Sequence, residues 1–301
     1  DFAFREILAI YRPALIFTEM ISADGVVYNF NSAINSLRIK ENGVPLGLQI
    51  YGSKPENFAK TIVKINNLEF DVIDINSGCC VKKIIKTKSG CCLMKDPVLI
   101  SKIINAVKSN TDRPVTIKMR LGYDKVNFIE CADAAVQAGA AMITLHGRTR
   151  SQKFSGIPDL EAIKLLKKSV SVPVIGNGGI KTPEDAKQML DKTGCDAIML
   201  ARGMLGKPWL VKQCVDYIKK GFYSEPGNEE KLDIVLKHLD LIVFDKGEYH
   251  GVKEFRKHIV RYSSGIELSR HFREKAVLIE DLKELRNSIL EIFKHRNVIM
   301  N

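Results

Sequence analysis

The feature that most constrains this chain is the regular alternation of short β-branched runs with amphipathic helical stretches. Several of the runs are almost continuously apolar and end in a polar residue, as strands buried on both faces do. This alternation predicts a parallel sheet with right-handed crossovers. The expected strands are Leu15–Glu19, Leu46–Ile50, Val72–Asn76, Val115–Met119, Met142–His146, Val174–Asn177 and Ala197–Leu200.

Helical patterns separate these strands, at Pro55–Asn66, Pro97–Ser109, Asn127–Ala138 and Pro183–Lys192. The spacing predicts a (β/α)8 TIM barrel that lacks one strand. Because the chain opens on a helix-like stretch, Asp1–Tyr11, we expect the first strand to lie upstream of it. An open doubly wound sheet is the alternative, which the lack of a Gly-rich turn after an early strand disfavours.

The pattern changes after Trp209. Two stretches, Asn228–Asp245 and Glu280–Lys294, carry apolar residues on one helical face and predict a C-terminal helical bundle. The break lies in Gly221–Asn228, which is rich in Gly, Ser and Pro. We therefore expect a barrel domain over residues 1–221 and a helical domain over residues 228–301.

Composition narrows the class of function. Hydrophobic residues make up 45% and charged residues 27%, which excludes a disordered chain. The 46 Lys and Arg against 35 Asp and Glu give a net charge of +11, which favours a polyanionic partner such as a nucleic acid. The seven Cys are an odd number and indicate a reducing compartment. Without a signal peptide or a long apolar run, we expect a cytoplasmic protein with no membrane partner.

Six long polar side chains close the predicted strands. In a barrel these ends meet on one rim, where active sites lie, so the residues predict a ligand-binding ring. They are Glu19, Gln49, Asn76, Lys118, His146 and Asn177.

Two glycine-containing loops follow the last two strands, Gly176-Asn177-Gly178-Gly179 and Ala201-Arg202-Gly203. Backbone N–H groups in such loops, together with Arg202, suit a phosphate. Lys118 lies within an apolar strand, where a charge needs a partner, either an anionic ligand or a neighbouring carboxylate.

Cys79 lies just past a strand end, where its thiol could serve as a general acid, and nearby lysines would lower its pKa. The pairs Cys79-Cys80 and Cys91-Cys92 lack the usual spacing of zinc or iron–sulfur ligands, so we expect no metal there. Val81–Lys95 contains five lysines and no acidic residue, and predicts a mobile loop that contacts phosphates.

A second basic cluster lies in the C-terminal region, at Lys253, Arg256, Lys257, His258 and Arg261. The histidines from His238 onward are scattered and form no metal motif. We therefore expect them at the surface or against RNA, and we expect no metal site anywhere in the chain.

Taken together, the motifs resemble the tRNA-dihydrouridine synthase family, and most closely its bacterial B-type branch. The resembling stretches run in order through the predicted barrel. They are Thr18-Glu19-Met20, Gln49-Ile50-Tyr51-Gly52-Ser53, Asp74-Ile75-Asn76-Ser77-Gly78-Cys79, Val115-Thr116-Ile117-Lys118-Met119-Arg120, His146-Gly147-Arg148-Thr149-Arg150, Asn177-Gly178-Gly179-Ile180 and Ala201-Arg202-Gly203 through Gly206-Lys207-Pro208-Trp209.

The resemblance implies an FMN-dependent enzyme in which NADPH reduces the flavin. Reduced FMN gives hydride to C6 of a uridine in tRNA, and Cys79 gives the proton to C5. Residues implied to bind the cofactor are Gln49, Lys118, His146, Asn177, Gly178, Gly179, Ala201 and Arg202. Residues expected to contact tRNA are Asn76, Arg148, Lys82, Lys83, Arg256 and Lys257.

The chain departs from the family pattern at Cys80, where a proline is usual, and this change would loosen the loop. Two alternatives stay open at this point. One is a flavin barrel that acts on a small molecule, such as a dihydroorotate-type dehydrogenase. The other is an RNA-binding protein without catalysis. We expect a monomer.

Overall fold

A parallel sheet dominates the larger of two compact units in the computed structural model, which describes residues 1–35, 37, 43–264 and 269–294. This unit comprises Ala14–Ile180 and Glu184–Leu200. Its strands are β1 (Ile16–Phe17), β2 (Ile21–Ser22), β3 (Leu46–Tyr51), β4 (Val72–Ser77), β5 (Val115–Arg120), β6 (Met142–His146), β7 (Val174–Asn177) and β8 (Ala197–Met199).

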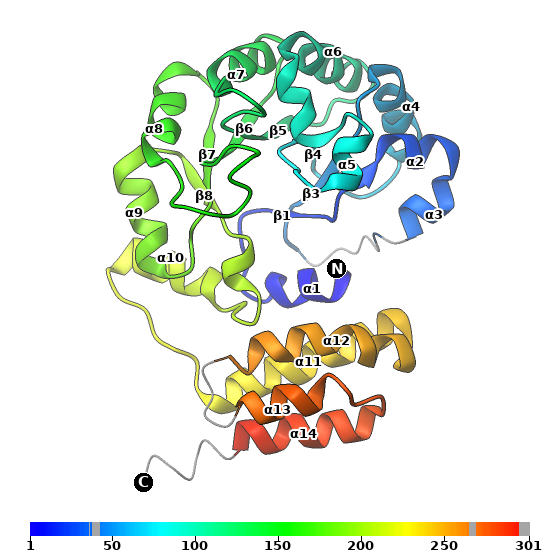
Figure 1. Cartoon of the computed structure of the whole chain (residues 1–301), viewed down its shortest axis with the longest axis vertical. Coiled ribbons are helices and arrows are strands. Elements are labelled where there is room, and N and C mark those ends of the chain that lie inside the picture. The colour runs from blue at the N-terminus through cyan, green and yellow to red at the C-terminus, as the bar shows by residue number, and fades with distance from the viewer. Residues whose placement is uncertain (36, 38–42, 265–268, 295–301) are drawn as a thin grey trace. The chain divides into compact units, whose positions relative to one another are not determined.

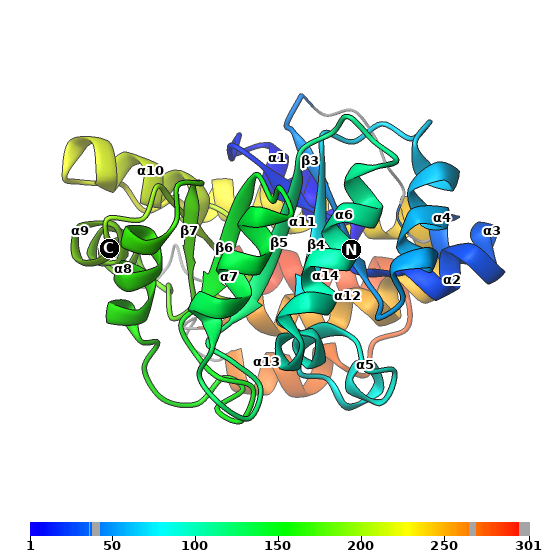
Figure 2. The ribbon, with the colours of Figure 1, turned by 90° about the horizontal axis from the view of Figure 1, so that it is seen from above.

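The strands follow one another in the order β1-β3-β4-β5-β6-β7-β8, and β2 also pairs with β3. Every pairing is parallel, and among the described residues none joins β8 to β1. Figure 2 shows β4 to β7 running side by side. The predicted TIM-like α/β arrangement is therefore confirmed as a half-barrel. Among the described strands, β2 is the one that the sequence analysis did not predict, because its two residues are too few to form a pattern.

Helices cover the outside of this arc of strands, as Figure 1 shows for α4, α6, α7 and α8. Their apolar faces explain the arrangement: α6 turns Ile100, Ile103, Ile104 and Val107 inward, all of them buried. The helices of this unit are α2 (Ala23–Tyr28), α3 (Phe30–Asn35), α4 (Pro55–Ile65), α5 (Lys82–Lys86), α6 (Pro97–Lys108), α7 (Phe128–Gln137), α8 (Leu160–Ser169) and α9 (Pro183–Thr193), with a 3-10 helix, η1, at Gly90–Lys95.

The smaller unit is helical and comprises Asp1–Pro13, Lys181–Pro183 and Ala201–Asn301. Its core contains Val235, Leu239, Phe255 and Leu285, with Ile7 from the N-terminal helix, and all are fully buried. The elements are α1 (Phe2–Ala9), η2 (Arg202–Met204), α10 (Leu210–Lys220), α11 (Asn228–Lys246), α12 (Glu248–Tyr262), α13 (Ser269–Ala276) and α14 (Leu282–Lys294).

The predicted C-terminal helical bundle is therefore confirmed, with α1 packed on α11 as an additional member. The predicted division into residues 1–221 and 228–301 is a different partition of the chain and stays a prediction, and residues 295–301 lie outside the described part. Among the described residues, no helix combines the length and apolar character that crossing a bilayer requires.

Candidate active site

Polar side chains occupy alternate positions along the central strands, and strand register brings them into three rows. Because successive side chains of a strand point to opposite faces, residues two apart share one face of the sheet. The intervening positions hold apolar residues such as Ile75 and Ile117, both buried. The three rows are Gln49-Asp74-Thr116, Asn76-Lys118-Thr144 and Arg120-His146-Asn177.

The first two rows are joined by a continuous chain of hydrogen bonds that ends on Asp74. Gln49 Nε2 donates to Asp74 Oδ2 at 2.6 Å, and Thr116 Oγ1 donates to Asp74 Oδ1 at 2.7 Å. Asn76 Nδ2 donates to Gln49 Oε1 at 2.8 Å. Asn76 donates to Gln49 and Gln49 donates to Asp74, so these bonds run in one direction and reinforce one another.

Asp74 is fully buried, and this burial raises its pKa from 3.8 to about 6. The hydrogen bonds from Thr116 and Gln49 and the charge of Lys118 act in the opposite direction and limit the rise. The carboxyl group is thus held near the border between its two protonation states. It was not among the site residues predicted from the sequence, although its position two residues before Asn76 on an apolar strand is a signal that it shares the polar face.

The far end of the chain of hydrogen bonds holds the backbone of Cys79. Asn76 Oδ1 accepts from the N–H of Cys79 at 2.9 Å and from that of Gly78 at 3.2 Å. On the other side, the carbonyl of Cys79 accepts from the N–H of Cys91 at 2.9 Å. Gly90 has a φ of 62°, and a Cβ there would lie 2.7 Å from that carbonyl oxygen. The loop of Cys79 is therefore held between β4 and η1.

Burial raises the pKa of the half-buried Cys79 thiol, whereas Lys118 and Arg120 and a backbone hydrogen bond lower it to a smaller extent. Lys118 thus lowers this pKa, as expected of a nearby lysine, but burial outweighs it and the net shift is upward. A raised pKa keeps the thiol protonated at neutral pH. The group is then a proton donor and a poor nucleophile.

Lys118 lies in the row between Asn76 and Thr144. Burial lowers its pKa to about 8, and the charge of Asp74 partly opposes that shift. Asp74 therefore supplies a neighbouring carboxylate for Lys118, and an anionic ligand as partner of this lysine stays a prediction. In the same row, Thr144 Oγ1 is buried and has no hydrogen-bond partner among the described residues. Buried hydroxyl groups are usually paired, so this one marks a position suited to a polar ligand.

Two buried arginines fix the loops beyond the strand ends. Arg120 donates to the carbonyls of Gly78 at 2.8 Å, Thr149 at 3.0 Å and Lys153 at 2.8 Å. It thereby ties the loop before Cys79 to the loop after β6. Sequence reasoning missed this role, although Arg120 continues the period-two pattern from Thr116 and Lys118.

Arg148 and His146 are in direct contact, since Arg148 Nη1 lies 3.1 Å from His146 Nε2. A guanidinium can only donate, so Nε2 accepts and the imidazole proton resides on Nδ1. Arg148 also donates to the carbonyls of Ser155 and Gly156. The same loop carries Phe154, a 53% exposed ring whose centroid lies 6.4 Å from that of His146. After Asp74 and Arg120, Phe154 is the third residue that the sequence analysis did not select, and no pattern in the sequence marks it.

The loop after β7 has the backbone expected of a close-approach site. Gly178 and Gly179 have φ values of 115° and 79°, which side chains rarely tolerate. A Cβ on Gly178 would lie 2.5 Å from the His146 ring. Asn177 turns its amide inward, where Nδ2 donates to the carbonyl of Met199 at 2.8 Å. In the helical unit, Ala201 and Arg202 are exposed and form the start of η2.

The lysine-rich segment differs from the predicted mobile loop. It folds as α5 and η1, and Ile84, Cys91, Leu93 and Met94 anchor it by burial. Lys82 and Lys83 are exposed on α5. An alternation of basic and apolar residues over one helical turn was the overlooked signal.

The predicted RNA contacts of α12 are engaged within the helical unit. Arg256 Nε donates to the carbonyl of Ile279 at 2.8 Å, and Lys257 Nζ lies 2.7 Å from Glu254 Oε1. His238 and His258 are buried, so the expectation of surface histidines is wrong for both. It holds for His250, which is exposed.

Comparison with known proteins identifies relatives over almost the whole chain. The family model described as dihydrouridine synthase matches residues 1–297. A protein named probable tRNA-dihydrouridine synthase from Rickettsia conorii is 37% identical over 97% of this chain and 90% of its own length. The tRNA-dihydrouridine synthase B of Pasteurella multocida is 38% identical over 94% of this chain and 86% of its own length.

Among solved structures, the 6-hydroxypseudooxynicotine amine oxidase of Pseudomonas geniculata N1 is similar with a TM-score of 0.53. The match covers 78% of this chain and 47% of that one, at 13% sequence identity. At this identity the likeness concerns the fold alone.

Proposed function

Since the chain belongs to the dihydrouridine synthase family and is an enzyme of tRNA modification, we propose that it reduces specific uridines of tRNA to 5,6-dihydrouridine. The proposal takes NADPH as reductant, FMN as cofactor and Cys79 as proton donor. The observation that carries it is the position of Cys79: Asn76 holds its backbone N–H at the end of the hydrogen-bond chain, and burial raises the pKa of its thiol.

The residues of the polar rows fit a flavin by their chemistry. A flavin ring presents hydrogen-bond acceptors along one edge, and its reduced form carries negative charge there. Lys118 supplies a cation, while Thr144 supplies a buried hydroxyl with no other described partner. We assign Gln49, Lys118 and His146 to the ring.

We assign the phosphate end to backbone groups of two loops. Gly178 and Gly179 have positive φ and no side chain, so their N–H groups can approach an anion closely. Asn177 holds this loop through its bond to Met199. Ala201 and Arg202 are assigned to the same end of the cofactor, Arg202 through its charge.

When bound, FMN would supply the hydride for C6 of the uracil. The proton for C5 would come from a residue of this chain. The Cys79 thiol, kept protonated by burial, donates from Sγ to C5, and the thiolate left behind is stabilised by Lys118 and Arg120, whose charges favour it. Bulk solvent reprotonates the half-buried sulfur after the product leaves.

The target uridine must leave its stack to reach the rim, which costs a few kcal/mol. Phe154 offers an exposed aromatic face 6.4 Å from the His146 ring, and we propose that it stacks on the flipped uracil or its neighbour. Asn76 and Arg148 would border the base, while Lys82, Lys83, Arg256 and Lys257 would contact the phosphates.

Separating the two halves of the reaction tests this proposal. The flavin of the wild-type protein should be bleached by NADPH without oxygen and reoxidised when unmodified tRNA is added. Cys79→Ala should bleach at the wild-type rate, because the thiol takes no part in that half, but should lose the reoxidation by tRNA. Cys80→Ala is the matched control and should retain both halves. A Cys79→Ala protein that is reoxidised by tRNA as fast as wild type would remove Cys79 as the donor.

A further inference from the structure

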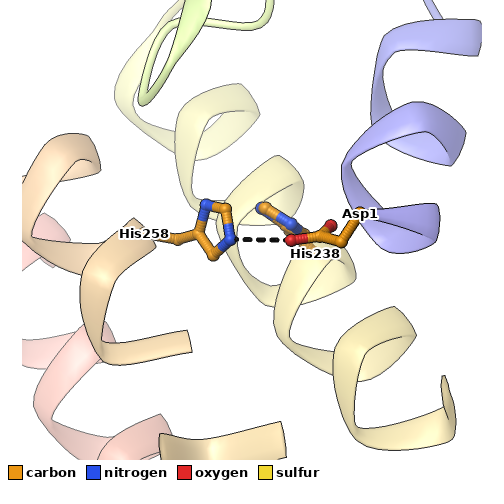
Figure 3. Close-up of side chains that lie close together, drawn as sticks. All are labelled: Asp1, His238 and His258. Atoms are coloured by element: carbon orange, nitrogen blue, oxygen red, sulfur yellow. Dashed lines mark hydrogen bonds and ion pairs between the residues drawn. The ribbon is translucent and has the colours of Figure 1, made fainter. Parts of the chain in front are cut away.

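Two buried histidines and an aspartate meet inside the helical unit, and none of the three takes part in the proposed hydride or proton transfer. They are Asp1, which begins the turn into α1, His238 of α11 and His258 of α12. One ligand atom of each lies within 4.8 Å of those of the other two. Figure 3 shows the three side chains pointing toward one another from three separate helical segments.

The Asp1 carboxylate is held in a fixed orientation by both oxygens. Oδ1 accepts from the backbone N–H of Phe4 at 2.9 Å, which makes Asp1 the N-cap of α1. Oδ2 faces His258 Nε2 at 3.2 Å. A tetrahedral zinc ion with bonds of about 2.1 Å separates its ligand atoms by about 3.4 Å, so this pair already has the spacing of two ligands.

His238 presents an unpartnered nitrogen to the same point. Its side chain is fully buried, and its Nδ1 lies 3.0 Å from the Tyr262 hydroxyl. Its Nε2 is also buried and has no hydrogen-bond partner among the described residues. If Nδ1 carries the ring proton and donates to Tyr262, Nε2 keeps its lone pair, as in metal sites where an outer partner fixes the ligand's tautomer.

Aromatic rings flank His238 on two sides. The Phe4 ring lies 5.5 Å from the His238 ring, and the Phe255 ring lies at the same distance on another side. Burial lowers the pKa of both histidines, that of His258 to about 4, so both rings are neutral and able to ligate. Lys257 Nζ lies 4.0 Å from Asp1 Oδ2, but this lysine is 59% exposed and also pairs with Glu254.

We infer that Asp1, His238 and His258 form a binding site for a divalent transition-metal ion, with Zn²⁺ as the best match. Two imidazole nitrogens and one carboxylate oxygen are ligands that zinc accepts, and a water molecule would complete a tetrahedral site. Binding transfers the His258 ring proton from Nε2 to Nδ1, so the ring stays neutral and no proton is released. The ion links α1, α11 and α12, and its role is structural.

The test uses untagged full-length protein, first as purified and then after treatment with a chelator. Elemental analysis should find about one zinc per chain in a preparation grown with zinc. The treated protein should bind Co²⁺ or Zn²⁺ at a ratio of one, and bound Co²⁺ should give the visible absorption of a tetrahedral site without a thiolate band. That spectrum separates this site from any formed by the seven cysteines.

Substitutions assign the ligands. His258→Gln and His238→Gln should each weaken metal binding by at least about 100-fold, and Tyr262→Phe should weaken it by about 10-fold because the outer hydrogen bond is lost. His250→Gln removes an exposed histidine of α12 and should leave the affinity unchanged. If either ligand variant fails to fold, the metal affinities of Tyr262→Phe and of the other variant decide the assignment.

Two results would overturn the inference. One is the absence of saturable binding in the wild-type protein at micromolar Zn²⁺ after chelation. The other is unchanged affinity in the folded members of the set His238→Gln, His258→Gln and Tyr262→Phe. Neither result depends on the proposed reaction, because metal binding is measured directly.

Discussion

The buried carboxyl group of Asp74 makes a quantitative prediction about pH and stability. Burial raises its pKa from 3.8 to about 6 in the folded protein. An acid whose pKa is raised on folding binds its proton more tightly in the folded state, so its favourable contribution is complete at low pH and is lost as the pH rises through about 6. A shift of this size corresponds to about 3 kcal/mol.

Asp74→Asn removes this ionisation and keeps the shape of the side chain. The asparagine Oδ1 can accept from Gln49 Nε2, and its Nδ2 can donate to Thr116 Oγ1, whose hydroxyl can turn toward the carbonyl of Ile73 at 3.4 Å. The variant should therefore fold. Its stability relative to wild type should increase by about 1 kcal/mol between about pH 5 and about pH 7.5, the part of the linkage that falls in this window.

Urea unfolding of both proteins across this range, in matched flavin-free preparations, measures the difference. Asp133→Asn, at an exposed position of α7, serves as the control and should follow the wild-type curve. Parallel stability curves for Asp74→Asn and wild type would refute the reasoning, because the carboxyl group would then titrate alike in the folded and unfolded chains.

Four further outcomes are expected. Lys118→Met should weaken flavin retention or slow flavin reduction, measured by absorbance, because the cation beside Asp74 is lost. Arg120→Met should lower the free energy of unfolding by about 3 kcal/mol, measured with urea, since three carbonyl groups lose their donor. Gly206→Ala should cost at least about 2 kcal/mol more than Gly221→Ala: both glycines have a φ of 78°, but only at Gly206 would a Cβ lie 2.5 Å from the Arg261 backbone. The double change Lys82→Ala and Lys83→Ala should lower the slope of log affinity for tRNA against log salt by about 1.5, whereas Lys102→Ala on α6 should leave the slope unchanged.

The sequence predicted the sheet well because its strands are near-continuous β-branched runs, such as Val115-Thr116-Ile117, whose burial on both faces overrides local alternatives. Some of the helices that it missed are short, such as α2, α3 and α5, whereas α8 and α10 are amphipathic helices of 10 and 11 residues that the named helical stretches did not include. The prediction of a loop over Val81–Lys95 is wrong because the five lysines of this segment mask the buried Ile84, Leu93 and Met94. The strand expected upstream of the chain stays a prediction.

Strand ends could be predicted as site positions because a parallel sheet collects them at one edge. Asp74 and Thr116 lie two residues before the polar residues Asn76 and Lys118. They could not be selected as site residues without the strand register, which places them opposite each other. The meeting of Asp1 with His238 and His258 depends on the packing of α1 against α11 and α12, which no local pattern reveals.

We have proposed that this chain converts uridine of tRNA to dihydrouridine through the Cys79 thiol. Nucleoside mass spectrometry of unmodified tRNA, incubated with NADPH, FMN and the purified protein, tests it most directly. A new nucleoside two mass units heavier than uridine should form with wild type and with Cys80→Ala, and should be absent with Cys79→Ala. Failure of wild type to form this nucleoside, or its undiminished formation by Cys79→Ala, would contradict the account.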